Sequence, residues 1–268
     1  MDSVAVTFGH RLWWVDAFIG DAERGNPAVV VLLERAMPDA ELQQIASELG
    51  VSETAFVRRT GDGWSLRWFT PTTEVDLCGH ATLATAHVVL SELGVPGGEV
   101  YFTTRAGRLS ARRLPDGLLA IDLPRSYLEP LDASVLNGAL GSVREVYQAG
   151  PASVLAVVED YDTLCGLAVD PVSLFLVPSS LVIVACHGGP EVDASIRVFA
   201  PRLGVGEDPV TGSAMCAVAP WWVEQVGSPT VSVRQASARG GLMFARLFEH
   251  NVEVAGAART FFGGDLRS

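Results

Sequence analysis

A glutamate within an apolar segment is the first candidate for acid/base chemistry. Glu53 lies in the segment Val-Ser-Glu-Thr-Ala-Phe-Val, residues 51–57. If this segment is a strand, Glu53 shares one face with Val51, Ala55 and Val57. Apolar surroundings raise the pKa of a carboxyl group and suit it to removing and returning a proton near neutral pH. A helix-capping or edge-exposed glutamate is the structural alternative.

Two glycines precede runs of small apolar residues that predict helices. Gly79 stands before the run 81–90, and Gly212 begins the run 212–223. The free N–H groups and the dipole of a helix N-terminus attract anions, so two such termini at one cleft would hold a carboxylate. Glycines that only permit tight turns are the structural alternative.

Two polar residues lie beside these glycines. His80 follows Gly79 directly, and its imidazole could donate to a carboxylate or a carbonyl group. Asp208 precedes Pro209 just before the second predicted helix. A helix cap is the structural alternative for Asp208, and a structural histidine is the alternative for His80.

The residue types that are missing limit the chemistry. All 19 basic residues are arginine, so the chain has no lysine for a Schiff base or for a phosphate-binding loop. Neither a GxGxxG motif after a strand nor an HExxH motif occurs, and the cysteines show no CxxC spacing. They are Cys78, Cys165, Cys186 and Cys216. We therefore predict acid/base chemistry without a metal or an organic cofactor.

An internal repeat supplies the elements that would position these residues. Residues 65–71 and 195–201 share the pattern S-[LI]-R-x-F-x-P at an offset of 130. Continuing this register places Cys78 opposite Asp208. Each copy predicts a strand, a proline-containing loop, a glycine turn and a small-residue helix. The chain is therefore expected to contain two copies of one supersecondary unit.

The remaining pattern fits two α/β halves. Residues 38–49 predict a helix with a proline near its start and a glycine after its end. Two prolines and two charged residues in 124–130 mark the best boundary. We predict an N-terminal half, 1–126, with Glu53 and His80. The C-terminal half, 127–268, would contain Asp208 and Ser213, with its last residues able to pack back on the first half.

Composition excludes several partners. The chain has 268 residues, is 49% hydrophobic and has a formal net charge of −12, which disfavours a nucleic-acid surface. Its first twenty residues lack the pattern of a signal peptide, and apolar runs such as 181–186 are too short to span a membrane. A cytoplasmic location is the default expectation, and a homodimer stays open.

Five motifs occur in an order that resembles the PhzF-like (phenazine biosynthesis-like) family. They are GNPAVV at 25–30, SETAF at 52–56, RWFTP at 67–71, CGHATL at 78–83 and EDPVTGSA at 207–214. The resemblance implies an α+β class with the diaminopimelate epimerase-like fold. This fold has two pseudo-symmetric halves, each a curved β-sheet or barrel around a central helix, with the active site between them.

The resemblance also implies site roles. Glu53 would shuttle a proton on a cyclic unsaturated amino acid without a cofactor. The residues that would position the substrate are His80, Asp208, Gly212 and Ser213, with Gly79 in the first helix-terminal cradle and Cys78 beside it. We therefore predict a cofactor-independent isomerase that moves a proton, and with it a double bond, on a small carboxylate. Amino-acid-like or dihydroaromatic carboxylates of specialised metabolism are the expected substrates.

One departure and two alternatives accompany this prediction. Residues 235–241 read QASARGG, where the family usually has a Gln-Gly stretch leading to Gly-Arg-Pro, which suggests a specialised substrate. A two-base racemase could use Cys78, but the register places Asp208 opposite it and Cys216 lies beyond the helix start. A non-catalytic binding protein on the same fold is the other alternative.

Overall fold

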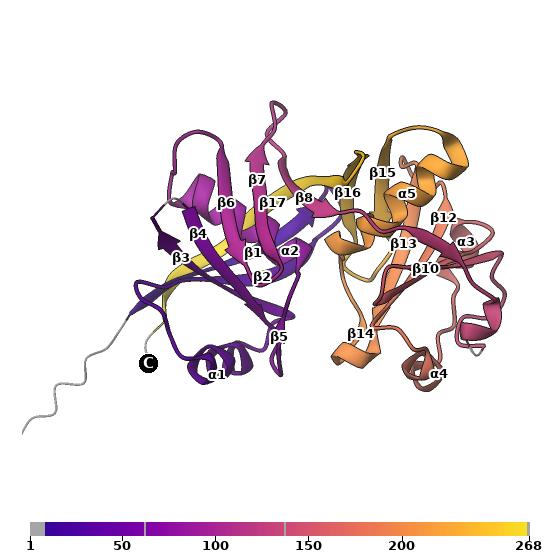
Figure 1. Cartoon of the computed structure of the whole chain (residues 1–268), viewed down its shortest axis with the longest axis horizontal. Helices are drawn as coiled ribbons and strands as arrows, with labels where there is room; N and C mark the ends of the chain where they lie inside the picture. Colours follow the sequence, from indigo (N-terminus) through magenta and orange to yellow (C-terminus); the bar gives the residue numbers. More distant parts are fainter. Residues whose placement is uncertain (1–8, 62, 137, 267–268) are drawn as a thin grey trace, which may run out of the picture. The chain divides into compact units, whose positions relative to one another are not determined.

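The chain divides into two compact units. The structure is a computed structural model that describes residues 9–61, 63–136 and 138–266. Unit 1 comprises Met1–Ala17, Pro27–Leu119 and Ala258–Ser268, and unit 2 comprises Phe18–Asn26 and Ala120–Ala257. Four strands contain residues of both units, namely β1 (His10–Ile19), β2 (Asn26–Leu32), β8 (Leu119–Pro124) and β17 (Asn251–Leu266) (Figure 1).

Unit 1 is a mixed sheet with a buried helix. Its further strands are β3 (Glu53–Thr60), β4 (Gly63–Phe69), β5 (Glu74–Val75), β6 (Glu99–Thr104) and β7 (Gly107–Arg113). The helices are α1 (Asp39–Leu49) and α2 (Gly79–His87), and α2 continues as the π-helical turn η1 (Val88–Glu92). Residues 79–86 of α2 are all buried, because small and apolar residues surround the helix axis. The predicted helix at 38–49 corresponds to α1, which ends at Gly50 in the left-handed conformation.

Unit 2 contains a similar mixed sheet, with additional strands and short helices. Its further strands are β9 (Leu128–Pro130), β10 (Glu145–Ala149), β11 (Ser153–Val157), β12 (Leu181–His187), β13 (Ala194–Ala200), β14 (Val205–Glu207), β15 (Thr230–Gln235) and β16 (Gly241–Leu247). Its helices are η2 (Ala133–Leu136), α3 (Tyr161–Cys165), α4 (Pro171–Leu176), η3 (Pro201–Leu203), η4 (Gly212–Ala214) and α5 (Met215–Val226). The predicted second helix therefore begins as the 3₁₀ turn η4 and continues as α5.

The pairing of the strands confirms the internal duplication. In unit 1, β2 to β3 is parallel, β3 to β4 antiparallel, β4 to β6 parallel and β6 to β7 antiparallel. In unit 2, β11, β12, β13, β15 and β16 follow the same sequence of pairings. Thr54 pairs with Phe69 as Val182 pairs with Phe199. Consequently Glu53, one residue before Thr54, corresponds to Leu181 in the second copy.

The two copies also share an ion pair. Arg67 binds Glu74 through two hydrogen bonds of 2.7 Å, and Arg197 binds Glu207 through two of 2.8 Å. Each guanidinium lies 5.1 Å from the centre of the phenylalanine ring two residues later. Bidentate pairs of this kind fix geometry as well as adding energy, so both copies hold their sheet edge in the same way.

The extended register of the repeat was wrong by three residues. Phe69 pairs with Glu74, five residues later, whereas Phe199 pairs with Glu207, eight residues later. The 3₁₀ turn η3 accommodates the longer connection in unit 2. Cys78 is therefore opposite Thr211, and not Asp208, since both precede the first residue of a helix.

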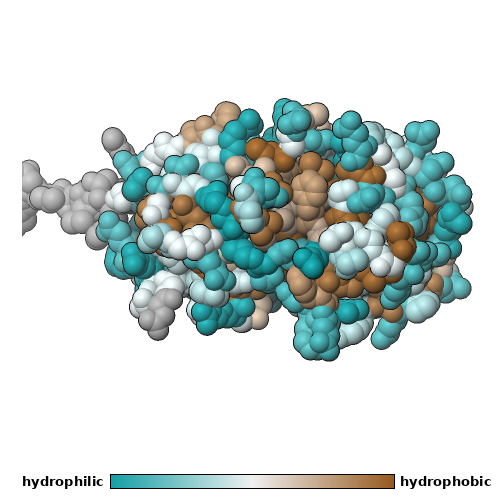
Figure 2. All heavy atoms as spheres, turned by 90° about the horizontal axis from the view of Figure 1, so that it is seen from above, coloured by the Kyte–Doolittle hydropathy of each residue, from teal (hydrophilic) through white to brown (hydrophobic). Residues whose placement is uncertain are grey.

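Apolar side chains are not confined to the interior. Val172, Phe175 and Leu176 of α4 are exposed, as are Phe261 and Phe262 of β17. Figure 2 shows hydrophilic and apolar residues interspersed on the face that it presents. Scattered exposed apolar residues are ordinary for globular proteins.

Close packing at one glycine of β17 provides a test of the fold. A Cβ at Gly256 would lie 2.5 Å from Cδ1 of the buried Phe18. We expect Gly256→Ala to lower the free energy of unfolding by about 1–3 kcal/mol, because the ring must move within a packed core. Gly206→Ala is the matched control, since its Cβ would meet nothing within 4 Å. Equal urea midpoints for the two variants would contradict this packing.

Candidate functional site

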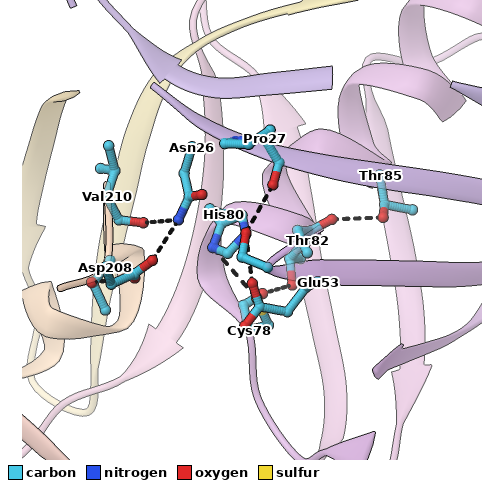
Figure 3. A network of polar contacts seen from close by, with 12 residues as sticks. Asn26, Pro27, Glu53, Cys78, His80, Thr82, Thr85, Asp208 and Val210 are labelled. Carbon is cyan, nitrogen blue, oxygen red and sulfur yellow. Dashed lines mark hydrogen bonds and ion pairs between the residues drawn. The ribbon is translucent and has the colours of Figure 1, made fainter. Parts of the chain in front are cut away.

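Three side chains of unit 1 converge at the N-terminus of α2. Glu53 is the first residue of β3, Cys78 is the residue before α2, and His80 is the second residue of α2. Glu53 Oε2 lies 3.0 Å from His80 Nε2, and Cys78 Sγ lies 3.6 Å from His80 Nδ1. Figure 3 shows the imidazole between the carboxylate and the thiol. The structure thus brings together three of the predicted site residues.

Local hydrogen bonds fix the backbone on both sides of this cluster. Ser52 Oγ donates to the carbonyl of Pro27 at 3.1 Å, which holds the entry to β3 beside β2. Thr82 Oγ1 donates to the carbonyl of Cys78 at 2.5 Å, within the first turn of α2. Both threonine and serine commonly bond to nearby backbone in this way. The positions of Glu53 and Cys78 therefore follow from their immediate sequence neighbours.

Burial and charge set the protonation states of the cluster. The side chain of His80 is 4% exposed and that of Glu53 is 14% exposed. Burial lowers the pKa of His80, but the electrostatic interactions and hydrogen bonds with Cys78 and Glu53 raise it and prevail, so the pKa lies well above its ordinary value. Burial raises the pKa of the Cys78 thiol, and the charge of His80 opposes this only in part. The raised pKa values favour a protonated imidazole at His80 and an uncharged thiol at Cys78.

The expected surroundings of Glu53 are present, together with one feature that the sequence did not predict. Val51, Ala55 and Val57 are buried, as the strand pattern predicted. The ion pair with His80 was not foreseen, because nothing in the spacing of residues 53 and 80 places them together. The helical alternative for Glu53 is excluded, since the residue begins β3.

In unit 2, Asp208 is held in a network of its own. Its Oδ1 accepts a hydrogen bond of 2.8 Å from Asn26 Nδ2, and its Oδ2 accepts one of 2.5 Å from Thr211 Oγ1. Asn26 Nδ2 also donates to the carbonyl of Val210 at 2.8 Å (Figure 3). Both carboxylate oxygens thus have a partner within unit 2. The residue that precedes η4 is Thr211, and Asp208 accepts from the Thr211 side chain and not from a helix N–H, so the helix-cap alternative for Asp208 is wrong.

The atypical segment 235–241 supports this network. Gln235 is fully buried, and its Nε2 donates to the carbonyl of Asp208 at 2.6 Å while its Oε1 accepts from the N–H of Thr211 at 2.8 Å. Ser237 Oγ donates to the carbonyl of Pro209 at 2.6 Å. Gly241 packs so closely that a Cβ there would lie 2.2 Å from Val210 Cγ2. The segment therefore fixes the loop 208–211.

The same segment also binds the chain before Asn26. Arg239 Nε donates to the carbonyl of Gly25 at 2.7 Å, and the N–H of Gly25 donates to the carbonyl of Gly240 at 3.0 Å. Asn26 and Gln235 are thus supporting residues that were absent from the predicted site. Their signal in the sequence was weak: Asn26 stands in the Gly-Asn-Pro motif, and Gln235 begins the segment that departs from the family.

The remaining predicted residues occupy the helix starts. Gly79 is the first residue of α2, and Gly212 and Ser213 begin η4. Their contact with a substrate stays a prediction. Among the described residues, no helix is both long and apolar enough to cross a membrane.

The cluster in unit 1 has the residue types of a metal site. One ligating atom each from Glu53, Cys78 and His80 lies within 4.8 Å of the others. Within the described ranges this is the one such group of three. The sequence did not predict it, because the CxxC and HExxH spacings that usually reveal metal sites are missing.

Comparison with known proteins identifies the fold and the family. Two similar halves with mixed sheets and buried helices define the diaminopimelate epimerase-like class, which confirms the predicted fold class. A hydroxyproline epimerase from Agrobacterium vitis has this fold, with a TM-score of 0.69 at 14% identity over 97% of this chain and 92% of its own. The family model described as "Phenazine biosynthesis-like protein" matches residues 15–264. The chain belongs to this family, as its motifs predicted.

Individual relatives extend over nearly the whole chain. An uncharacterized isomerase of Pseudomonas aeruginosa is 40% identical over 94% of this chain and 97% of its own. The human phenazine biosynthesis-like domain-containing protein is 35% identical over 94% of this chain and 96% of its own. The crystal structure of a PhzF family protein from Enterococcus faecalis has a TM-score of 0.88 at 35% identity, covering 97% and 99% of the two chains. These similarities support an isomerase in general.

The role of Gln235 can be tested through stability. Gln235→Leu keeps the size of the side chain but leaves the buried N–H of Thr211 and the carbonyl of Asp208 without their partner. We expect the free energy of unfolding to fall by about 2–4 kcal/mol. Gln43→Leu is the control, since half-buried Gln43 makes a single hydrogen bond, to the carbonyl of Thr70. A smaller loss for Gln235→Leu than for Gln43→Leu in urea unfolding would show that the segment does not fix the loop.

Proposed function

We propose that this protein is a cofactor-independent isomerase that moves a proton on a small carboxylate substrate, with Glu53 as the general acid and base. The observation that carries the proposal is the pair formed by the Glu53 carboxylate and the His80 imidazole, 3.0 Å apart and largely buried. A carboxylate paired in this way is held in one orientation, from which it can accept a proton.

The proposed reaction uses one acid/base group of the protein, the Glu53 carboxyl group, and two carbon atoms of the substrate. Glu53 removes a proton from carbon, which breaks a C–H bond and forms an O–H bond on the carboxyl group. The electron pair that is left delocalises through the adjacent double bond. The same carboxyl group then returns the proton to another carbon, so the double bond migrates and Glu53 is again a carboxylate. His80 orients Glu53 throughout by its charge.

The divergence of the two copies favours a single acid/base. Leu181 occupies the position of Glu53 in the second copy, and Thr211 occupies that of Cys78. Leucine cannot transfer a proton, and the threonine hydroxyl is a very weak acid. Unit 2 therefore lacks a counterpart of either group, whereas a two-base racemase would need a second one. In this proposal Gly79, the first residue of α2, positions the substrate beside Glu53.

The racemase alternative has one observation in its favour, the position of the Cys78 thiol beside His80. Against it stands the raised pKa of Cys78, which burial causes and which makes the thiol a poor source of the thiolate base. Amino-acid-like or dihydroaromatic carboxylates remain the proposed substrates, by analogy with the family.

The Glu53→Gln variant tests the acid/base assignment. We expect it to keep the fold and to lose proton exchange by a factor on the order of 10² to 10⁴, because an amide of the same shape cannot accept the proton. The measurement is deuterium incorporation from D₂O into a panel of unsaturated amino acids and dihydroaromatic acids, followed by mass spectrometry. Glu48→Gln, on the exposed face of α1, is the matched control.

Cys78→Ala separates the two enzymatic readings in the same assay. The isomerase proposal expects a smaller loss of exchange for Cys78→Ala than for Glu53→Gln. If Cys78→Ala abolishes exchange while Glu53→Gln retains a near-normal rate, the thiol racemase replaces the proposal. Binding of a panel acid without exchange by the unaltered protein would instead favour a non-catalytic binding protein.

Treatment with a chelator tests whether the exchange activity requires a metal ion. Since the proposed steps use only side chains of the chain itself, the protein is expected to retain its exchange activity after dialysis against EDTA. Loss of exchange that added Zn²⁺ or Mg²⁺ restores would overturn this part of the proposal.

A further inference from the structure

We infer that Glu53, Cys78 and His80 form a binding site for a soft divalent cation, with Zn²⁺ as its representative, and that the bound ion blocks proton transfer. The inhibitory effect rests on the proposed function, whereas the binding itself does not. The residues combine a thiol sulfur, an imidazole nitrogen and a carboxylate oxygen, which are the three ligand types that Zn²⁺ takes from proteins.

The spacing of the ligand atoms is close to that of a tetrahedral site. With Zn–S near 2.3 Å and Zn–N or Zn–O near 2.0–2.1 Å, neighbouring ligand atoms lie roughly 3.3–3.6 Å apart. Here the Cys78 Sγ to His80 Nδ1 distance is 3.6 Å, the Glu53 Oε2 to His80 Nε2 distance is 3.0 Å, and one atom of each residue lies within 4.8 Å of the others. Cys78 Sγ and His80 Nδ1 therefore already have the spacing of two zinc ligands, whereas the 3.0 Å distance to Glu53 involves the other ring nitrogen, Nε2.

One side chain must move to complete the site. An imidazole uses one nitrogen for an ion, and His80 presents Nδ1 to Cys78 and Nε2 to Glu53. Cys78 and His80 lie on one buried turn at the start of α2, so their positions relative to each other are fixed. Glu53 is the most exposed of the three and has the longest side chain, so it is the ligand that rotates towards the ion.

Ligand type and charge give the selectivity. Sulfur and imidazole nitrogen favour Zn²⁺, Co²⁺ and Cd²⁺, whereas Mg²⁺ and Ca²⁺ prefer oxygen ligands. Binding of the ion releases the thiol proton of Cys78 and one ring proton of His80 to solvent. The resulting thiolate and the carboxylate together balance the two positive charges of the ion, which matters because buried charges need compensation. Three protein ligands leave a fourth position of the tetrahedron open to water or to a carboxylate.

The consequence for catalysis follows from the lone pairs of Glu53. A carboxylate oxygen that ligates a cation is a far weaker base, and Glu53, once it has rotated towards the ion, no longer pairs with His80 Nε2. An enzyme of this construction is therefore inhibited by the ion, and removal of the ion restores its activity.

Cobalt provides a spectroscopic test of the site that is independent of activity. The whole chain, freed of metal with EDTA, is titrated with Co²⁺, and the absorption of thiolate-to-cobalt charge transfer is recorded in the near ultraviolet. We expect a saturable band that Zn²⁺ displaces and Mg²⁺ does not. Cys78→Ser should abolish the band, and Glu53→Gln and His80→Gln should weaken Co²⁺ binding at least about tenfold.

Cys165→Ser is the matched control, because Cys165 is the exposed cysteine and lies outside the cluster. The band should persist in this variant. Circular dichroism establishes that each variant is folded, and Cys78→Ala replaces Cys78→Ser if the latter is not. The site is overturned if the band fails to form, if Cys165→Ser removes it in place of Cys78→Ser, or if Mg²⁺ competes as well as Zn²⁺.

The deuterium-exchange assay separates this inference from the proposed function. Inhibition of exchange by Zn²⁺, reversed by EDTA, is the expected result. Stimulation of exchange by Zn²⁺ would overturn the inhibitory role. A Co²⁺ band from Cys78 in a protein that exchanges no acid of the panel would support the site and count against the proposed function alone.

Discussion

The ion pair between Glu53 and His80 is the interaction on which the candidate chemistry depends. A buried charge is costly unless an opposite charge compensates it, and removing one partner leaves the other uncompensated. The pair therefore requires the start of β3 and the first turn of α2 to lie side by side. The surrounding hydrogen bonds of Ser52 and Thr82, and the small residues of α2, satisfy this requirement.

Duplication of the sheet has preserved the scaffold and changed the chemistry. Both copies retain the bidentate pair, Arg67 with Glu74 and Arg197 with Glu207, because it holds the same strand edge in each. At the position of Glu53 the second copy has Leu181. Unit 1 thus contains Glu53, the proposed acid/base, whereas unit 2 fixes Asp208 through neutral donors, among them Asn26 and Thr211.

The proposed acid/base and the inferred metal site arise from the same physical arrangement. A carboxylate, an imidazole and a thiol in a largely buried cluster can exchange protons with a substrate, and their lone pairs can also ligate a soft cation. A site of this composition is exposed to inhibition by Zn²⁺ unless the thiol is replaced. In this inference, Cys78 gives the cluster its affinity for a soft metal ion, although the proposed proton transfer does not use the thiol.

The sequence by itself determined the family, the fold class, the duplication and several elements. Its five motifs and the helix at 38–49 could be predicted because local propensity and the spacing of apolar residues are properties of neighbouring positions. Glu53, Cys78 and His80 were identified in the same way, each from its own segment. The sequence did not predict how these segments lie relative to one another, because the distance between Glu53 and His80 depends on how β3 and α2 pack.

Only the tertiary structure decided the register of the repeat and the support of Asp208. Three additional residues around η3 shift the correspondence of Cys78 from Asp208 to Thr211, and no periodic signal in the sequence marks such an insertion. Asn26 and Gln235 reach Asp208 from positions 182 and 27 residues away. Hydrogen bonds between residues so far apart in the sequence form only when the whole unit packs. Residue types and local spacing therefore cannot reveal them.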